Sequence, residues 1–229
     1  MTFQINGLIG FGAAAAGVAA TISFTASTVQ VATATTYTFL SQSFGTADPT
    51  RNILAAVTNE RSGGSNATVS SLSIGGIAAS LVAGAQVAGA DGCELWVAPV
   101  PTGTSGTVAL TLANAALSVG VGLFATYNAS ATRTDVGTDT DSNPATFAID
   151  IPAGGVAVAI GLQRSNSGAT FTSSGLTENY DETVEAGDIY HTGASAAFAA
   201  AQTNLTISIT SSDASVRAPV MVTASFPSL

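Results

Sequence analysis

The residues best suited to chemistry lie in one acidic stretch, TDVGTDTDSNPATFAID. Asp139, Asp141 and Asn143 occupy alternate positions, which is the spacing of the first three oxygen ligands in a calcium loop of the helix-loop-helix type. Asp150 falls on the twelfth position of that loop, but Pro144 stands where a glycine turn is needed and Asp150 lies in an expected strand. The stretch therefore predicts either a calcium site with its own geometry, formed by Asp139, Asp141 and Asn143, or a solvated acidic turn. Calcium is the only cofactor that the sequence suggests.

A second acidic segment mixes carboxylates with aromatic side chains. Its members are Glu178, Tyr180, Asp181, Glu182, Glu185, Asp188, Tyr190 and His191. Paired carboxylates can hydrolyse glycosides, but the clefts that do so are usually lined with several aromatic residues, and this chain has one Trp and four Tyr. A solvent-exposed turn is the favoured interpretation. His191 is the single histidine, and neither a nucleophile elbow nor a phosphate loop with its lysine occurs, so we expect no enzyme.

Trp96 is the aromatic residue whose position most suggests a partner. In the segment CELWVAP, Cys93, Leu95 and Val97 alternate with Glu94 and Trp96, so Trp96 falls on the face opposite the apolar row. An outward Trp can contact a protein partner or stack on a sugar. The alternative is that a loop, the N-terminal segment or the core of an unequal sandwich buries it. Cys93 is the single cysteine and is expected to be a small buried apolar residue, without a disulfide in the chain.

The composition argues against two classes of partner. Lysine is absent, five arginines are the only cations apart from His191, and the formal net charge is −9. Binding to nucleic acid or to anionic lipid needs clustered basic residues, so we expect neither nucleic acid nor a membrane as partner. Charged residues make up 8% of the chain, against about 25% in typical soluble domains. Ser, Thr, Ala and Gly replace them, so the surface is either solvated by hydroxyl groups or covered by neighbouring subunits.

Alternation of apolar and polar residues predicts the elements. The clearest segment is VSSLSIGGIAASLV at residues 69–82, where Gly75 and Gly76 form a two-residue hairpin loop that pairs Ile74 with Ile77. This register puts Leu72, Ile74, Ile77, Ala79 and Leu81 on one face. The same alternation recurs in roughly a dozen short segments after residue 20, and no helical period of useful length occurs. We therefore expect an all-β fold, an antiparallel β-sandwich of jelly-roll type with an N-terminal arm.

The first 20 residues differ from the rest of the chain. Residues 7–20, GLIGFGAAAAGVAA, are apolar without alternation, too short and Gly-rich for a membrane span, and preceded by no basic residue of a signal peptide. We expect residues 1–20 to form an arm or anchor that docks on a partner or on its own domain through Leu8, Phe11 and Val18. A cleaved or membrane-associated leader is the alternative. Residues 21–229 are expected to form a single β-sandwich that draws strands from both halves, against a division near residues 132–144, where the sequence turns polar.

Four segments in order resemble virion proteins of tailed bacteriophages over about residues 37–226: NILAAV, VSSLSIGGIAASLV, LWVAPVPTGTSGTVALTL and DIPAGGVAVAI. The resemblance implies a non-enzymatic structural protein located in the virion, a capsid decoration or a fibre- or tail-associated protein. It further implies other virion proteins and further copies of the same chain as partners, and anchoring by the N-terminal part. The rival hypothesis is a carbohydrate-binding or host-adhesion module for a host surface glycan, using Trp96 or the region of Tyr180 and Tyr190. A secreted or cell-surface adhesin is the third.

Overall fold

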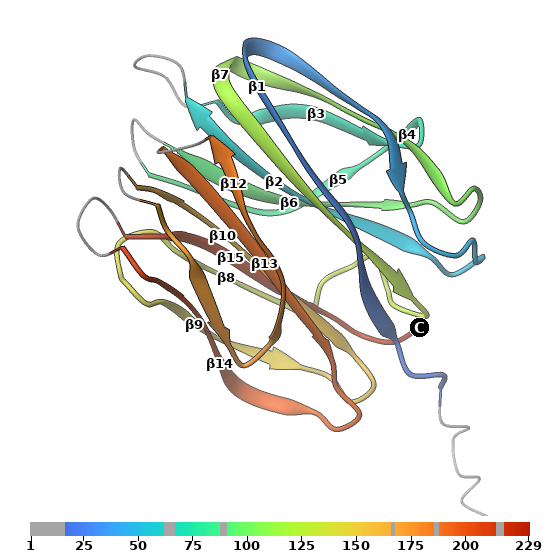
Figure 1. Ribbon diagram of the computed structural model, residues 1–229. Coiled ribbons are helices and arrows are strands. Elements are labelled where there is room, and N and C mark those ends of the chain that lie inside the picture. The colour runs from blue at the N-terminus through green and yellow to red at the C-terminus, as the bar shows by residue number, and fades with distance from the viewer. Residues whose placement is uncertain (1–16, 62–66, 88–90, 166–167, 186–187, 214–217) are drawn as a thin grey trace, which may run out of the picture.

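The protein is all-β, as expected. The computed structural model describes residues 17–61, 67–87, 91–165, 168–185, 188–213 and 218–229, and the secondary structure of these residues consists of fifteen strands in three antiparallel sheets (Figure 1). Within these ranges there is no helix long and apolar enough to cross a membrane. β1 begins at Thr21, directly after the expected arm.

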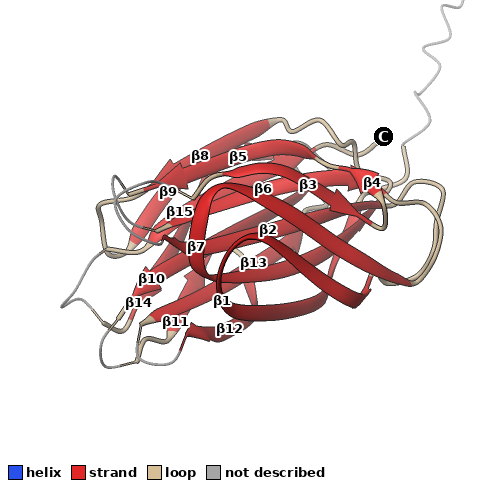
Figure 2. Ribbon diagram, turned by 90° about the horizontal axis from the view of Figure 1, so that it is seen from above, coloured by secondary structure: helices blue, strands red, loops and turns tan. Residues whose placement is uncertain are grey.

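The first sheet has seven strands in the order β4-β3-β7-β2-β6-β5, with β1 along the free side of β7. Its strands are β1 (Thr21–Ser43), β2 (Asn52–Arg61), β3 (Val69–Ile74), β4 (Ile77–Ala78), β5 (Ser80–Gln86), β6 (Gly92–Pro99) and β7 (Ser105–Tyr127). β7 pairs with β3 through its first part and with β2 through its later part, while β1 follows it along its whole length. The sheet therefore bends over and nearly closes on itself like a barrel, and we call it the bent sheet (Figures 1 and 2).

The remaining strands form a five-stranded sheet, β12-β13-β10-β15-β8, and a three-stranded sheet, β11-β14-β9. Their bounds are β8 (Asp135–Asp139), β9 (Ala145–Ile151), β10 (Val156–Arg164), β11 (Phe171–Ser174), β12 (Thr177–Glu185), β13 (Ile189–Ala197), β14 (Gln202–Ser211) and β15 (Val220–Phe226). The five-stranded sheet lies between the bent sheet and the three-stranded sheet. The molecule is therefore a stack of layers.

Three hydrophobic clusters fill this stack. One lies inside the bent sheet and includes Phe39 and Trp96, and a second joins the bent sheet to the five-stranded sheet through residues such as Phe124. The third lies between the five- and three-stranded sheets. In β10 the valines 156 and 158 face the second cluster and the alanines 157 and 159 face the third. The alternation of large and small apolar residues in that strand thus reflects burial on both faces.

The hairpin of residues 69–82 follows the expected register only near its turn. Ile74 pairs with Ile77, and the amide of Ala79 donates to the carbonyl of Leu72 over 2.9 Å. After Ala79 the chain leaves β3, and β5 pairs with β6 instead. The expectation that Leu81 shares a face with Leu72 and Ile74 is therefore wrong. Its side chain is 51% exposed while theirs are buried, because β5 forms the edge of another part of the sheet.

The two halves of the chain contribute separate sheets. Every strand of the bent sheet lies within residues 21–127, and every strand of the other two sheets lies within residues 135–226. The second hydrophobic cluster is shared by both halves. Whether residues 21–229 form a single sandwich domain, or two units divided near residues 132–144, stays a prediction.

Candidate functional site

The expected arm is described only at its base. Leu8 and Phe11 lie outside the described residues, and the side chain of Val18 is 68% exposed. Ala20 is buried, and its amide donates to the carbonyl of Gly154 over 2.8 Å. The arm therefore joins the body beside the turn that precedes β10. The exposed side chain of Val18 is open to a partner.

The acidic loop begins where β8 ends. The carboxylate of Asp139 accepts hydrogen bonds from the amides of Asp141 (3.2 Å) and Thr146 (2.9 Å) and from the hydroxyl of Ser142. Partial burial would raise the pKa of Asp139, but these hydrogen bonds outweigh it and the pKa is lowered. Asn143 instead bonds the backbone of Ser211 in β14 with both ends of its amide.

The structure thus brings Asp139 and Asp141 into one turn and directs the amide of Asn143 elsewhere. Across the described ranges, no three His, Cys, Asp or Glu side chains gather as metal ligands. Calcium binding at Asp139, Asp141 and Asn143 stays a prediction.

Trp96 lies inside the bent sheet and is 8% exposed. Its indole nitrogen donates to Oε2 of Glu94 over 2.9 Å, and Oε1 of Glu94 accepts the amide of Val69 over the same distance. Trp96 does lie on the face opposite Cys93 and Leu95, but that face lines the interior because the sheet bends around it. The outward orientation is therefore wrong and the alternative, burial in the core, is confirmed, so Trp96 offers little surface to a sugar or a protein partner.

Residues 178–185 lie in β12 and residues 189–191 in β13, so these parts of the acidic segment are strands rather than an exposed turn. Tyr180 and Tyr190 are buried, so a glycan cannot stack on their rings. His191 is fully buried, with Nδ1 3.1 Å from the hydroxyl oxygen of Thr58 and Nε2 3.8 Å from the carboxylate of Glu182. Thr58 is also fully buried, so no substrate reaches its hydroxyl and this group of three is not a hydrolytic triad.

A charged cluster joins the two halves at one end of their contact. Arg164 of β10 pairs with Asp188 over 2.9 Å and with Glu60 of β2, and lies 3.7 Å from Asp91. Burial, the charge of Asp188 and hydrogen bonds to Glu185 and Asp188 raise the pKa of Glu60 to about 8. The sequence did not indicate this cluster, because its members come from four separate strands or turns.

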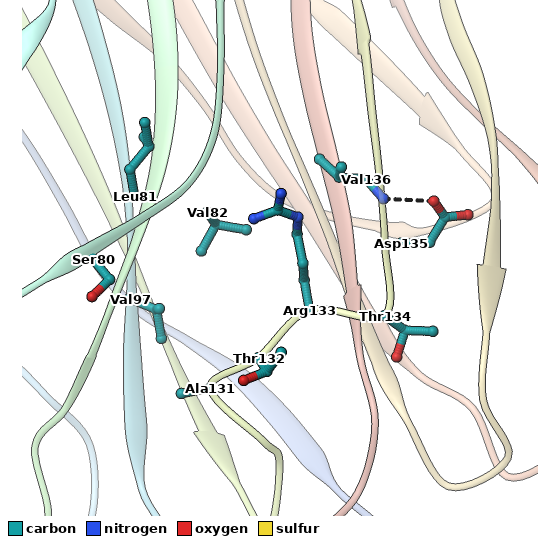
Figure 3. A pocket seen from close by; sticks show the side chains of 10 residues that line it. All are labelled: Ser80, Leu81, Val82, Val97, Ala131, Thr132, Arg133, Thr134, Asp135 and Val136. Atoms are coloured by element: carbon teal, nitrogen blue, oxygen red, sulfur yellow. Dashed lines mark hydrogen bonds between the residues drawn. The ribbon is translucent and has the colours of Figure 1, made fainter.

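An open pocket of about 520 Å³ lies where β5 of the bent sheet meets β8 of the five-stranded sheet (Figure 3). Val82, Val97 and Val136 provide its apolar surface, and Leu81 stands exposed at its rim. Its polar lining consists of Ser80, Thr132, Thr134, Asp135 and Arg133. Figure 3 shows the Arg133 side chain reaching between Val82 and Val136. Both halves of the chain therefore build this pocket, which we call the seam pocket.

Arg133 differs from the other arginines whose side chains the structure describes. Arg51 is buried with its guanidinium donating to backbone carbonyls, and Arg164 pairs with carboxylates. Arg133 is exposed and, among the described residues, has no ion pair or hydrogen bond. The neighbouring Asp135 forms no ion pair with Arg133, and its carboxylate accepts the amides of Val136 and Asp150, each over 2.8 Å. A guanidinium with free donors can bind a carboxylate or a phosphate through two parallel hydrogen bonds.

No protein-family model, curated protein or solved structure matches the chain. The chain's own strand order and side chains must therefore carry any functional assignment. By geometry, the seam pocket is the candidate site, since it combines a free cation with apolar and hydroxyl-bearing walls. The signal that could have found it is a lone arginine in a polar stretch between two sets of strands.

Proposed function

We propose that this chain is a non-enzymatic structural protein of a phage particle, a capsid decoration or a fibre- or tail-associated protein of jelly-roll type, anchored through its N-terminal arm. The observation that supports this most is the order in which the strands pair. In an eight-stranded jelly roll the first strand pairs with the eighth, the second with the seventh, the third with the sixth and the fourth with the fifth. This fold is common in viral capsid proteins and in lectins.

The second half of the chain follows this order closely. Among β8–β15, β8 pairs with β15, β9 with β14 and β10 with β13, which are three of the four nested pairs. β10 also pairs with β15, and β11 with β14, as the two sheets of a jelly roll require. The departure is β12, which pairs with β13 in the five-stranded sheet.

The first half follows the same order if β1 and β7 each count as two strands and β4 and β5, which only Ala79 separates, count as one. Their regular pairing is interrupted between Val31 and Thr36 in β1, opposite residues 111–118 of β7. The first part of β1 then pairs with the last part of β7, and the second part of β1 with the first part of β7. β2 pairs with β6 and β3 with β4, which completes the four nested pairs. A tandem arrangement of two jelly rolls is thus the interpretation that we favour.

The distribution of charge supports the structural role. The first charged residue of the chain is Asp48, so neither the arm nor β1 carries a charge. Among the strands that the structure describes, β1 pairs with β7 alone, and its side chains Val31 and Leu40 are exposed. Long edge strands in soluble proteins are usually protected by charged residues or proline. An uncharged arm followed by an uncharged edge strand favours contact with other protein subunits.

Occupancy on particles tests this proposal. Phage particles lacking the protein are mixed either with the full chain or with a variant lacking residues 1–17, which keeps the hydrogen bond between Ala20 and Gly154. We expect the full chain to bind the particles at a fixed copy number and the truncated chain not to bind them. The circular dichroism spectrum of the truncated chain should match that of the full chain. Equal binding of both variants would refute the anchor, and no binding of the full chain would refute the virion assignment.

A carbohydrate-binding or host-adhesion module is the second candidate function. The observation that favours it is the seam pocket, because jelly rolls also serve as lectins and the pocket holds a free cation beside hydroxyl groups. The aromatic residues Trp96, Tyr180 and Tyr190 are buried and do not support it. An array of neutral and acidic glycans tests this candidate, and an array without hits would retire it.

A further inference from the structure

The seam pocket has the parts of a site for a charged, hydroxylated ligand. Its cation is Arg133, whose guanidinium has no partner among the described residues. Of the hydroxyl-bearing side chains at the pocket, those of Ser80, Thr132 and Thr134 likewise have no hydrogen-bond partner within the described ranges. These groups are therefore free to bond a ligand.

The backbone holds Arg133 in place from both sides. The amide of Ser130 donates to the carbonyl of Pro227 over 2.9 Å, and the amide of Thr134 donates to the carbonyl of Ser225 over 2.8 Å. The amide of Thr132 donates to the hydroxyl of Ser130 over 3.0 Å. The segment that carries the cation is thus tied to the end of β15 and to its own turn before any ligand arrives, which lowers the ordering cost of binding.

The walls of the pocket suit a sugar ring with one acidic group. Val82 and Val97 are buried beneath the pocket, while Leu81 is exposed at its rim and offers an apolar surface to the C–H face of a ring. A pocket of about 520 Å³ lies within the usual range for small-molecule sites.

We propose that the seam pocket binds a saccharide that bears a carboxylate, such as a uronic or sialic acid. The guanidinium of Arg133 holds the carboxylate, the hydroxyls of Ser80, Thr132 and Thr134 bond the sugar hydroxyls, and Leu81 contacts the ring. This inference rests on the second candidate function, and it names the ligand class and the residues that recognise it. It does not depend on whether the chain is anchored to a particle.

Calorimetric or NMR titration of the full chain tests the proposal with three probes: D-glucuronate, N-acetylneuraminate and neutral D-glucose. We expect an acidic sugar to bind with a dissociation constant of about 1 mM or below, and glucose to bind at least about tenfold more weakly. Arg133→Gln should weaken binding of the acidic sugar by about tenfold or more, and Arg133→Lys by less, because lysine keeps the charge without the two-pronged geometry.

The matched control is Glu178→Gln, which changes an exposed charge on β12, at the far edge of the five-stranded sheet, and should leave the affinity unchanged. Glucose 6-phosphate distinguishes a phosphate from a carboxylate, and a short acidic peptide distinguishes a protein ligand from a sugar. Tighter binding of either of these, retained affinity in Arg133→Gln, or no binding of acidic sugars at about 10 mM would overturn the proposal. A failure of the saccharide proposal would not change the expected occupancy on particles, so the saccharide proposal and the virion proposal fail separately.

Discussion

Arg51 holds two turns of the first half together, and replacing it by lysine tests that role. The residue is buried at the start of β2 with 1% of its surface exposed. Its guanidinium donates to six backbone carbonyls at distances of 2.7 to 3.1 Å, those of Phe44, Gly45, Thr46, Val100, Thr102 and Gly103. One side chain therefore connects the turn after β1 to the turn before β7.

The cost of Arg51→Lys follows from the number of donors. The guanidinium has five N–H donors, one of which two carbonyls share, whereas an ammonium group has three. With one carbonyl on each donor, three of the six carbonyls lose their partner. Each buried acceptor left without a hydrogen bond costs about 1 kcal/mol or more. We expect Arg51→Lys to lower the free energy of unfolding by about 3 kcal/mol. Arg51→Met should cost more, although removing a buried charge offsets part of its loss.

Urea unfolding followed by circular dichroism measures both variants, with the slope checked to confirm that the unfolded states are comparable. Arg133→Lys is the matched control. It is the same substitution at an exposed arginine, and we expect a change within about 0.5 kcal/mol. A stability of Arg51→Lys within that same margin of the parent would show that the six hydrogen bonds do not hold the turns together.

Two further predictions concern the contact between the halves. A Cβ at Gly122 would lie 2.3 Å from the hydroxyl of Tyr180, so Gly122→Ala should cost about 2 kcal/mol or more in the same assay, and Tyr180→Ala should remove most of that extra cost. Glu60 keeps its proton in the folded protein up to a pH of about 8, but loses it near 4.5 in the unfolded chain. The unfolded chain therefore binds fewer protons between these pH values, and the free energy of unfolding should fall by up to about 1.4 kcal/mol per pH unit. Unfolding measured at about pH 5, 7 and 9 checks this, and an unchanged slope in Glu60→Gln would refute the role of Glu60.

The strand pattern was readable from the sequence because alternation of side chains is a local property of an extended chain. It predicted the all-β class, the Gly75-Gly76 turn, and the opposite faces of Leu95 and Trp96. It did not predict which faces are buried. Trp96 is an interior residue because the sheet bends over it, and Leu81 is exposed because β5 pairs with β6 and not with β3.

The acidic residues illustrate the same limit. Spacing brought Asp139 and Asp141 into one turn, as local chain geometry requires, but the amide of Asn143 bonds β14 instead. The partners of Arg164 could not be anticipated, because Glu60 and Asp188 are far apart in the chain and meet only where two layers pack.

Composition and alternation by themselves determined that this chain forms β-sheets with few charges and one free thiol. The nested pairing of strands in the two halves, the bend of the first sheet and the seam pocket were decided by the tertiary structure. Strand pairing depends on backbone hydrogen bonds that every residue except proline can donate, so residue identity says little about which strands become neighbours. In the sequence, Arg133 is one arginine in a polar stretch, and its place in a pocket follows only from the packing of β5 beside β8.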